Sequence, residues 1–474
     1  MTSIQFFDDN RYIRVNNNIT GVVTYINKAG LVIQQDNASC FFLKNDSFYG
    51  YFNYTEVSYP VTASTSELVQ TLVAMSQTDV EGDTSVSVDI KGSVSVIDIS
   101  TPYDKNEYDI DELVLNGASS VFDGDESGVV MTLDASMNSR IVRQSKEYIS
   151  MPPGKDIIVL MSGTLCDAGA SNVNARIGLF DSYDDATDTA VKNGFGVFFN
   201  YNEVSGTSLV LRNTVGGVQT DTYVPQTDWN VDMADGVGNN GVLLDPLAPN
   251  TFVFSVGNIE GTKIHAGFYF KGVIQVVHQF DLPMDFNYAT RLPMRWEIGA
   301  TDGSVPSAST MIQKRGGVYM THSFEKSGVG FSHVTGTEKF NSVQNSITPL
   351  CSIRLKDSHI RGKIVLDKLT ILNTTNGGIG KWELIMNGDL TGDNFQSVNF
   401  LSGAEISTSE STITGGTVIQ SGYFHDLMEK EVAVDSLNRL RASISGTSDI
   451  LTLAITNMTG TMQMFGGITW SEYE

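Results

Sequence analysis

The chain has 474 residues, of which 41% are apolar and 18% charged, so it can bury several cores beneath a lightly charged surface. Its 45 glycines against 11 prolines, with many β-branched and aromatic residues, are typical of an all-β protein rich in tight turns. The formal net charge of −24 would repel a phosphate backbone. With no Lys/Arg cluster to offset it, nucleic-acid binding and attachment to an anionic membrane are both disfavoured.

The cysteines and the N-terminus bear on where the protein is made. Cys40, Cys166 and Cys351 are far apart and lack metal-ligand spacing, so we expect three reduced thiols in a protein made in a cytoplasm. Residues 1–5 contain no basic or apolar signal region, and no apolar run approaches the ~20 residues of a membrane span. We predict no membrane insertion. If the protein works outside a cell, we expect it to leave by a route other than secretion, such as inside a released particle.

Residues 1–78 are predicted to form an N-terminal docking segment. Short apolar runs separated by Asn- and Gly-rich turns predict β-hairpins up to about residue 62. Ser64 to Glu67 form a capping box, and the i, i+4 spacing of Leu68 and Leu72 predicts one short helix through Met75. This helix would pack on the hairpins or, alternatively, dock to another subunit.

Residues 79–112 are predicted to be a β-hairpin linker. Val86–Ile90 alternate with polar residues, Lys91-Gly92 forms a turn, and Val94–Val96 return. Because an isolated two-stranded unit is marginal in water, this hairpin must lean on a neighbouring domain or on another copy of the chain.

Residues 113–335 are predicted to form a central jelly-roll-like antiparallel sandwich, since the strands show a period of two. Between residues 264 and 270, one predicted face consists of Ile264, Ala266, Phe268 and Phe270. His265 and Tyr269 lie on the other face. After a turn at Lys271-Gly272, the returning strand is expected to alternate as well. Its two predicted faces are Ile274, Val276 and His278 against Val273, Val277 and Gln279.

Residues 336–474 are predicted to form a second antiparallel sandwich. Alternating runs at Ile353–Leu355, Ile364–Leu372, Trp382–Met386 and Leu451–Ile455 are separated by turns such as Gly415-Gly416. The predicted fold class is therefore all-β, with two consecutive jelly-roll or lectin-like sandwiches after a small β-rich segment carrying one short helix.

No residue pattern predicts catalysis, a cofactor or a metal. None of the six histidines stands in a metal-binding motif, and we interpret His265 and His278 as ordinary strand residues. Three acidic loops could in principle wrap calcium, but none has the complete twelve-residue pattern. These loops are Asp181–Asp188, Asp228–Asp245 and Asp123–Glu126. Nucleophile-elbow and phosphate-loop motifs are absent, so we predict a non-enzymatic protein.

The aromatic run Phe48 to Tyr54 is the densest in the chain. Aromatic side chains bury at subunit interfaces or stack on sugars, and interfaces are the commoner use. We favour an interface here, with a glycan site as the alternative.

Several segments carry a resemblance to a known protein class. The segment Asp228-Trp229-Asn230-Val231-Asp232 resembles a β-sandwich module of virion structural proteins from tailed bacteriophages, notably those of marine bacteria and cyanobacteria, and from some large DNA viruses. The similarity extends over Gly194–Phe199, Phe268–Phe280, Leu292–Ile298, Thr414–Ile419, Ser448–Leu453 and Thr65–Val69. The acidic insertion Ser182–Thr189 departs from that pattern.

The resemblance implies a decoration, spike or fibre component located in the virion. It would bind other virion proteins and sister chains, as a homotrimer, through its N-terminal region, and would display both sandwiches on the particle. The alternative is a carbohydrate-binding adhesin that recognises a host-surface glycan. A virion-borne depolymerase is a third hypothesis.

Overall fold

The computed structural model divides the chain into two compact units, residues 1–84 and 85–474. The structure describes residues 93–473 except for gaps at 151–156, 168–170, 183–194, 216–217, 238–240, 258–262, 271–272, 282–290, 302, 322–327, 338, 342, 360, 426–427 and 435–438, together with the six strands of the first unit. No α-helix occurs in this described part. Accordingly, no helix there is long and apolar enough to cross a membrane.

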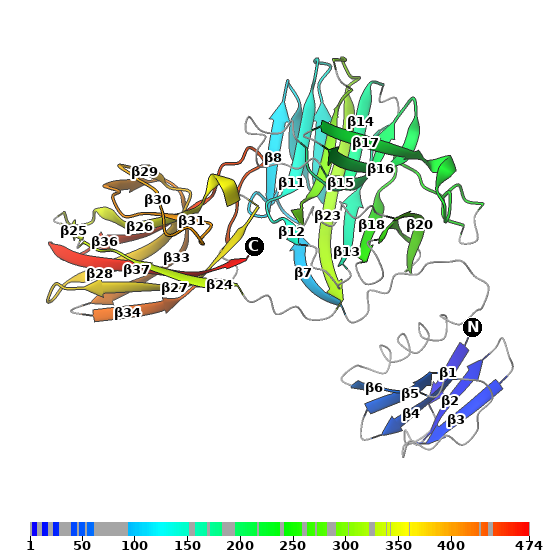
Figure 1. The fold of residues 1–474 in the computed structure, drawn as a ribbon, viewed down its shortest axis with the longest axis horizontal. Coiled ribbons are helices and arrows are strands. Elements are labelled where there is room, and N and C mark those ends of the chain that lie inside the picture. The colour runs from blue at the N-terminus through cyan, green and yellow to red at the C-terminus, as the bar shows by residue number, and fades with distance from the viewer. Residues whose placement is uncertain are drawn as a thin grey trace. The chain divides into compact units, whose positions relative to one another are not determined.

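The first unit contains two small antiparallel sheets, β1-β2-β3 and β4-β5-β6 (Figure 1). Their strands are β1 (Thr2–Phe6), β2 (Tyr12–Asn17), β3 (Val22–Asn27), β4 (Ser39–Lys44), β5 (Ser47–Phe52) and β6 (Thr55–Pro60). The predicted N-terminal β-structure is confirmed. The predicted helix at Ser66–Met75 and the first arm of the predicted hairpin lie outside the described residues.

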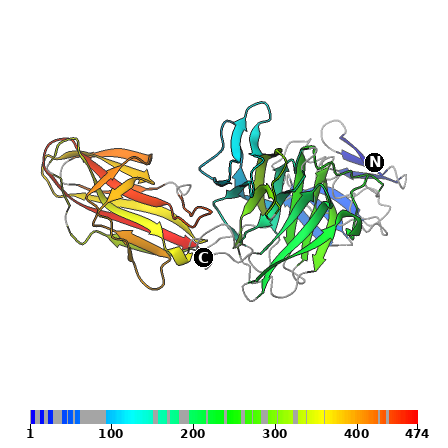
Figure 2. The same cartoon turned by 90° about the horizontal axis from the view of Figure 1, so that it is seen from above.

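The central sandwich consists of an eight-stranded and a seven-stranded antiparallel sheet (Figures 1 and 2). The eight strands are β7 (Ser93–Ile99), β9 (Ser119–Asp123), β10 (Gly128–Leu133), β13 (Ile157–Gly163), β18 (Asn250–Gly257), β19 (Lys263–Phe270), β20 (Val273–Asp281) and β23 (Ser309–Thr321). The seven, in sheet order, are β17 (Val218–Pro225), β16 (Gly206–Val215), β15 (Gly196–Asn202), β14 (Val173–Phe180), β22 (Met294–Ala300), β11 (Arg140–Ser145) and β8 (Ile110–Leu115). The short pair β12 (Ile149–Ser150) and β21 (Arg291–Leu292) and the 3-10 turn η4 (Gln226–Asp228) complete this part.

The predicted linker contributes strands to this sandwich. β7, which contains the returning arm Val94–Val96, pairs with β23 of the eight-stranded sheet. β8 begins at Ile110 and pairs with β11 of the seven-stranded sheet. Residues 93–99 and 110–112 are therefore hydrogen-bonded into the central sandwich, as expected for a hairpin arm that cannot stand alone.

The central core forms because alternate side chains of both sheets point between them. Ile264, Ala266 and Phe268 are buried in this core, whereas Tyr269 is 47% exposed, which confirms the predicted faces of β19. The predicted alternation of β20 is wrong. A β-bulge pairs Ala266 with His278 but Gly267 with Val276, so Val277 is the extra residue and faces the core.

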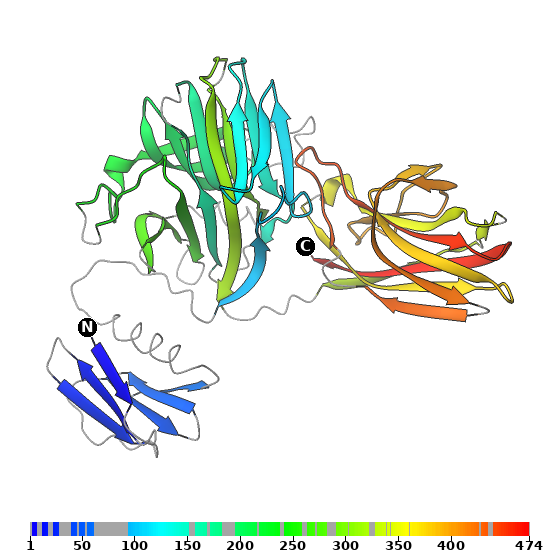
Figure 3. The same ribbon diagram turned by 180° about the vertical axis from the view of Figure 1, so that it is seen from behind.

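The C-terminal sandwich packs two six-stranded antiparallel sheets around a second core, as predicted (Figure 3). One sheet contains β24 (Val329–Val334), β25 (Lys339–Asn341), β27 (Lys363–Asn373), β34 (Met428–Ala433), β35 (Arg439–Leu440) and β37 (Met462–Tyr473). The other contains β26 (Ile347–Leu355), β28 (Ile379–Met386), β30 (Gln396–Ser397), β31 (Ala404–Ser407), β33 (Thr417–His425) and β36 (Ile450–Asn457). This part of the chain also contains a separate two-stranded sheet, formed by β29 (Asp389–Thr391) and β32 (Thr412–Thr414), and the 3-10 turn η6 (Asp357–His359).

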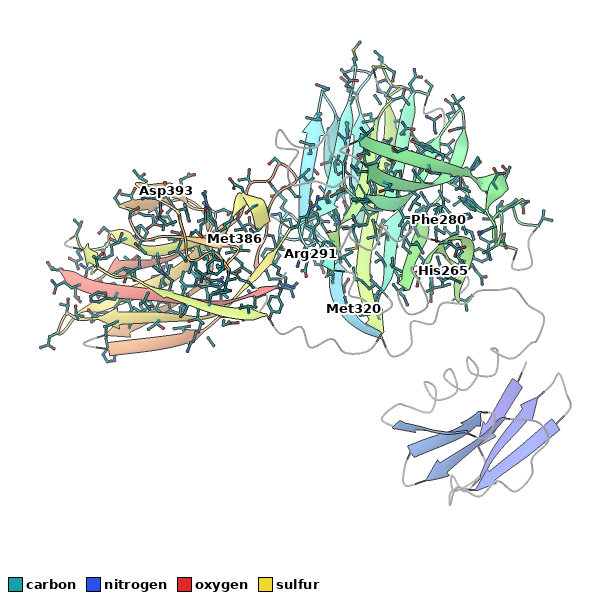
Figure 4. All side chains as sticks on the ribbon, in the orientation of Figure 1. His265, Phe280, Arg291, Met320, Met386 and Asp393 are labelled. Atoms are coloured by element: carbon teal, nitrogen blue, oxygen red, sulfur yellow. The ribbon has the colours of Figure 1, made fainter. Side chains whose placement is uncertain are left out.

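Cations of the C-terminal sandwich contact carboxylates of the central one. Lys363 lies 2.7 Å from the partly buried Glu147, which also accepts from Arg439. Arg441 pairs with Asp109 at 3.0 Å. Arg291, labelled between the sandwiches in Figure 4, donates to the Arg361 carbonyl oxygen. The two sandwiches therefore meet through charged and polar contacts.

Cys166 and Cys351 are buried, unpaired thiols in different cores, as predicted for reduced cysteines. Burial, with Asp167 nearby, raises the pKa of Cys166 to about 12. Cys40 lies in β4, where side chains are not described.

Substituting Phe268→Asp is expected to prevent folding of the central sandwich. Its ring is 4% exposed and lies 4.9 Å from the ring of Phe199 and 5.4 Å from that of Phe252, so a carboxylate there would be buried unpaired. Soluble yield and thermal melting measure the effect. Tyr269→Asp, one residue along on the exposed face, is the control and should melt like the wild type. A soluble Phe268→Asp protein with a cooperative melt would contradict the register of β19.

Candidate functional site

The seven-stranded sheet carries polar and charged side chains on the face turned away from the core, here called the outer face. In β22, Met294, Trp296 and Ile298 belong to the core, so Arg295 and Glu297 must point outward. The same alternation holds along the neighbouring strands. The outer-face residues used below are Arg140, Asn174, Arg176, Phe180, Phe198, Val210, Arg212, Asp221, Tyr223, Arg295 and Glu297.

Glu297 is the centre of this face, and three arginines surround it. Strand pairing places Arg176 directly opposite it, and Arg176 Nη1 lies 2.9 Å from Glu297 Oε1. Arg140 Nε donates to the same oxygen at 3.3 Å, and Arg295 Nε donates to Oε2 at 2.8 Å. Complete burial tends to raise the pKa of this carboxyl, but Arg140, Arg295 and Arg176 together outweigh it and hold the pKa well below its usual range.

Arg212 forms a second charged pair on the same face. It lies opposite Asp221 in the β16–β17 ladder, and its Nε and Nη2 each contact an oxygen of that carboxylate at 2.8 Å. Its guanidinium also stacks on two buried rings, 5.0 Å from the centroid of Phe198 and 5.5 Å from that of Phe180. Arg212 is 2% exposed, so its position is fixed from every side.

Arg140, Arg176, Arg212, Asp221 and Glu297 take part in lining a pocket of about 290 Å³ on the outer face. We call it the arginine pocket; its lining includes Arg140, Asn174, Arg176, Arg212, Gln219, Asp221, Tyr223, Glu297 and Gly299. Gly299 lies beside Arg140, and a Cβ at Gly299 would approach Arg140 Cγ to 3.1 Å, so the glycine leaves room for that side chain. Eight of the eleven described lining residues have a planar side chain that can form hydrogen bonds, which suits the binding of a polar ligand.

Asp181, a calcium candidate in the sequence, instead supports the wall of this pocket. It is 1% exposed, its Oδ2 accepts from Arg361 at 2.7 Å, and its Oδ1 accepts from the backbone amide of Phe195 at 3.1 Å. Its carbonyl oxygen accepts from Arg212 Nη1 at 3.0 Å. Both carboxylate oxygens are thus engaged within the protein; Asp184, Asp185 and Asp188 lie outside the described residues.

The other acidic loops use their carboxylates to stabilise turns. Asp232, Asp235 and Asp245 each accept a hydrogen bond from the backbone amide two residues later, at 2.8–3.0 Å. Asp123 does the same with Asp125 at 2.9 Å. Within the described residues, no group of three or more potential metal ligands lies together.

The two histidines on neighbouring strands have separate partners. His265 Nε2 lies 3.2 Å from Gln279 Oε1, and His278 Nδ1 accepts from the amide of Asn230 at 3.2 Å. Burial lowers the pKa of His278, consistent with a neutral acceptor. The Trp229 segment is thus attached to β20 through Asn230, and Trp229 itself packs in the core beside Phe199.

The arginine pocket was not predicted from the sequence, because its three arginines come from three strands spread between residues 140 and 212. One signal was present. In Met294-Arg295-Trp296-Glu297-Ile298, an arginine and a glutamate alternate with large apolar residues, which indicates charges fixed on one face of a buried strand.

No protein-family model matches the chain, and no curated protein matches it in sequence. Among solved structures, the carbohydrate recognition domain of Emp47p matches at 11% identity and a TM-score of 0.31, covering 49% of this chain and 98% of that one. Peanut lectin matches at 11% identity and 0.31, over 48% and 97%. A legume lectin-like domain from Entamoeba histolytica matches at 12% and 0.29, over 49% and 98%. Likeness at this level does not bear on what the chain binds.

Replacing Glu297 with glutamine is expected to destabilise the central sandwich by about 3–5 kcal/mol, because it leaves the surrounding guanidinium groups buried without their counter-charge. Chemical denaturation measures the loss. Glu405→Gln is the matched control, since Glu405 pairs with the single, partly exposed Arg354 and should cost about 1 kcal/mol or less.

The same variant should change the acid limb of the stability profile. The folded-state pKa of Glu297 is depressed, so its stabilisation is present above the unfolded value of about 4.3 and is lost as pH falls through the folded value. Glu297→Gln should therefore lose less stability than the wild type below about pH 4. Equal acid limbs would contradict the assignment.

Proposed function

We propose that the central sandwich binds carbohydrate in the arginine pocket and that the protein acts by binding rather than by catalysis. The observation that carries this proposal is a hollow of about 290 Å³ lined by guanidinium, amide, carboxylate and phenol groups held by ordered strands. Sugars present adjacent hydroxyls that planar side chains can bond in pairs, and apolar ring faces on which an aromatic ring can stack.

Two lining residues have capacity for such a ligand. Gln219 Oε1 is buried and has no hydrogen-bond partner among the described residues, so it would accept from a sugar hydroxyl. Tyr223 is 49% exposed and offers its ring to the pocket. The volume lies near the lower end of ligand pockets, roughly 300 Å³, which suits one sugar unit of a longer chain.

A binding role agrees with the chemistry of the pocket carboxylates. A glycosidase needs one carboxyl whose pKa is raised so that it can protonate the leaving group. The arginines act in the opposite direction on Glu297. Asp221 is held by both of its oxygens to Arg212. Among the described residues that line the pocket there is neither a histidine nor a cysteine.

We also propose that the chain is displayed on a virus particle as a homotrimer attached through residues 1–78. This part of the proposal is supported by the resemblance of several segments to virion structural proteins, and the charge of −24 suits a solvated, surface-exposed protein. The glycan bound by the central sandwich would then belong to the host surface.

Replacing Tyr223 with alanine is expected to weaken glycan binding by about tenfold, since an aromatic ring over a sugar is worth roughly 1 kcal/mol beyond its buried area. Binding is measured on a panel of neutral and acidic polysaccharides, with a reducing-end assay on the same mixtures. Tyr269→Ala is the matched control, because Tyr269 is 47% exposed on the other sheet. No binding to any polysaccharide, or equal loss in both variants, would contradict the site; released reducing ends would contradict a non-enzymatic role.

The particle assignment predicts that the purified 474-residue chain has the mass of a trimer in solution. Light scattering after size exclusion measures the mass, and mass spectrometry of purified particles measures its presence in the virion. A monomer at high concentration, together with absence from particles, would overturn this part of the proposal while leaving the glycan site open to its own test.

A further inference from the structure

The arginine pocket carries more positive than negative charge. Its described lining includes three arginines, Arg140, Arg176 and Arg212, and two carboxylates, Glu297 and Asp221. Among the described lining residues, three guanidinium groups against two carboxylates leave an excess of one positive charge. A fourth arginine, Arg295, pairs with Glu297 but is not part of the lining, and it adds a second positive charge. This excess occurs on a chain whose net charge is −24. A local excess of positive charge on an otherwise acidic protein favours a ligand with a negative group, which would neutralise that excess.

Two of the four arginines are occupied by the protein itself. Arg212 uses Nε and Nη2 for Asp221 and Nη1 for the carbonyl oxygen of Asp181. Arg295 is 0% exposed and bonds Glu297 and Gln144. Arg212 and Arg295 hold the carboxylates of Asp221 and Glu297 in place, and their guanidinium groups are not available to a ligand.

Arg176 has donor capacity left. Its Nε contacts Asn200 and its Nη1 contacts Glu297, and no described residue accepts from its Nη2. Its side chain is 18% exposed and lines the pocket, so Nη2 is accessible to a small ligand. Arg140, 19% exposed, shares Glu297 Oε1 with it. Two guanidinium groups that share one carboxylate oxygen repel each other, and a ligand anion beside them would relieve that repulsion.

We propose that the pocket selects an acidic glycan, whose carboxylate or sulfate group binds at Arg176 and Arg140. The inference rests on the proposed carbohydrate-binding function and specifies its ligand class. The anionic group accepts from Arg176 Nη2, while Gln219 and Tyr223 contact the neutral part of the sugar. A lone anion would leave those two residues without a contact, which favours a charged sugar over a free sulfate or phosphate.

The test compares two variants that differ only in charge. Tyr223 is half-exposed at the pocket, so Tyr223→Gln and Tyr223→Glu should both fold. Both variants lose the tyrosine ring, so a difference in affinity between them reports the added negative charge alone. The probes are polygalacturonate and its fully methylated ester, dextran sulfate and dextran, and inorganic sulfate alone. At low salt, Tyr223→Glu should bind a charged polymer about tenfold more weakly than Tyr223→Gln does, and the uncharged counterpart equally. Whichever charged polymer binds identifies the carboxylate or the sulfate as the recognised group.

Arg176→Gln provides the second variant, with Arg315→Gln as its matched control because Arg315 is exposed on β23 of the opposite sheet. Arg176→Gln should reduce binding of the charged polymer at least as much as Tyr223→Glu does, and Arg315→Gln should leave it unchanged. Thermal melting checks that each variant folds. Equal affinity for charged and uncharged members of each pair would overturn the inference and leave carbohydrate binding intact. Tight binding of inorganic sulfate alone, or equal loss in both arginine variants, would also overturn it. Absence of binding to every polymer would mean that the proposed function itself fails.

Discussion

The outer face of the seven-stranded sheet depends on the burial of Glu297 among arginines. A carboxylate removed from water costs several kcal/mol unless charged donors satisfy it, and here Arg140, Arg176 and Arg295 do so. The antiparallel register sets this geometry, because it places Arg176 opposite Glu297 and Arg212 opposite Asp221. The charged side chains are therefore positioned by strand pairing rather than by loops, and a ligand would contact groups whose positions are already fixed.

Asp181 connects this face to the second sandwich. Its carbonyl oxygen holds Arg212, whereas its carboxylate holds Arg361, which precedes β27 of the C-terminal sandwich. Asp181 is almost fully buried, so neither contact is exchanged readily for water. The C-terminal sandwich thus helps to support the wall of the arginine pocket. A chain truncated after the central sandwich would lose that support although its own core is complete.

The sequence predicted elements whose signal is local. The alternation of Ile264, Ala266 and Phe268 identified β19 and its buried face, and the repeated runs after residue 336 identified the second sandwich. The bulge opposite Gly267 was missed, because an extra residue in a strand changes the faces without changing the composition. The pocket was missed for a different reason. Arg140 and Arg295 meet at Glu297 only through the pairing of β11 with β22, and pairing partners cannot be read from one sequence. The acidic loops attracted attention because their aspartates are close in sequence, yet the carboxylates of Asp123, Asp232, Asp235 and Asp245 stabilise turns and that of Asp181 binds Arg361.

An acidic protein with a basic pocket can discriminate between anions by their size. The net charge of −24 acts over the whole surface and repels any long, stiff polyanion that must lie across it, such as a nucleic acid. At physiological salt, screening limits that repulsion to roughly 8 Å. A single carboxylate or sulfate that enters the pocket would approach Arg176 well inside this distance, where the local excess of positive charge dominates. Repulsion at long range and attraction at short range together favour a flexible glycan that can present one anionic group to the pocket over a stiff polyanion such as a nucleic acid, so the acidic surface would contribute to specificity as well as to solubility.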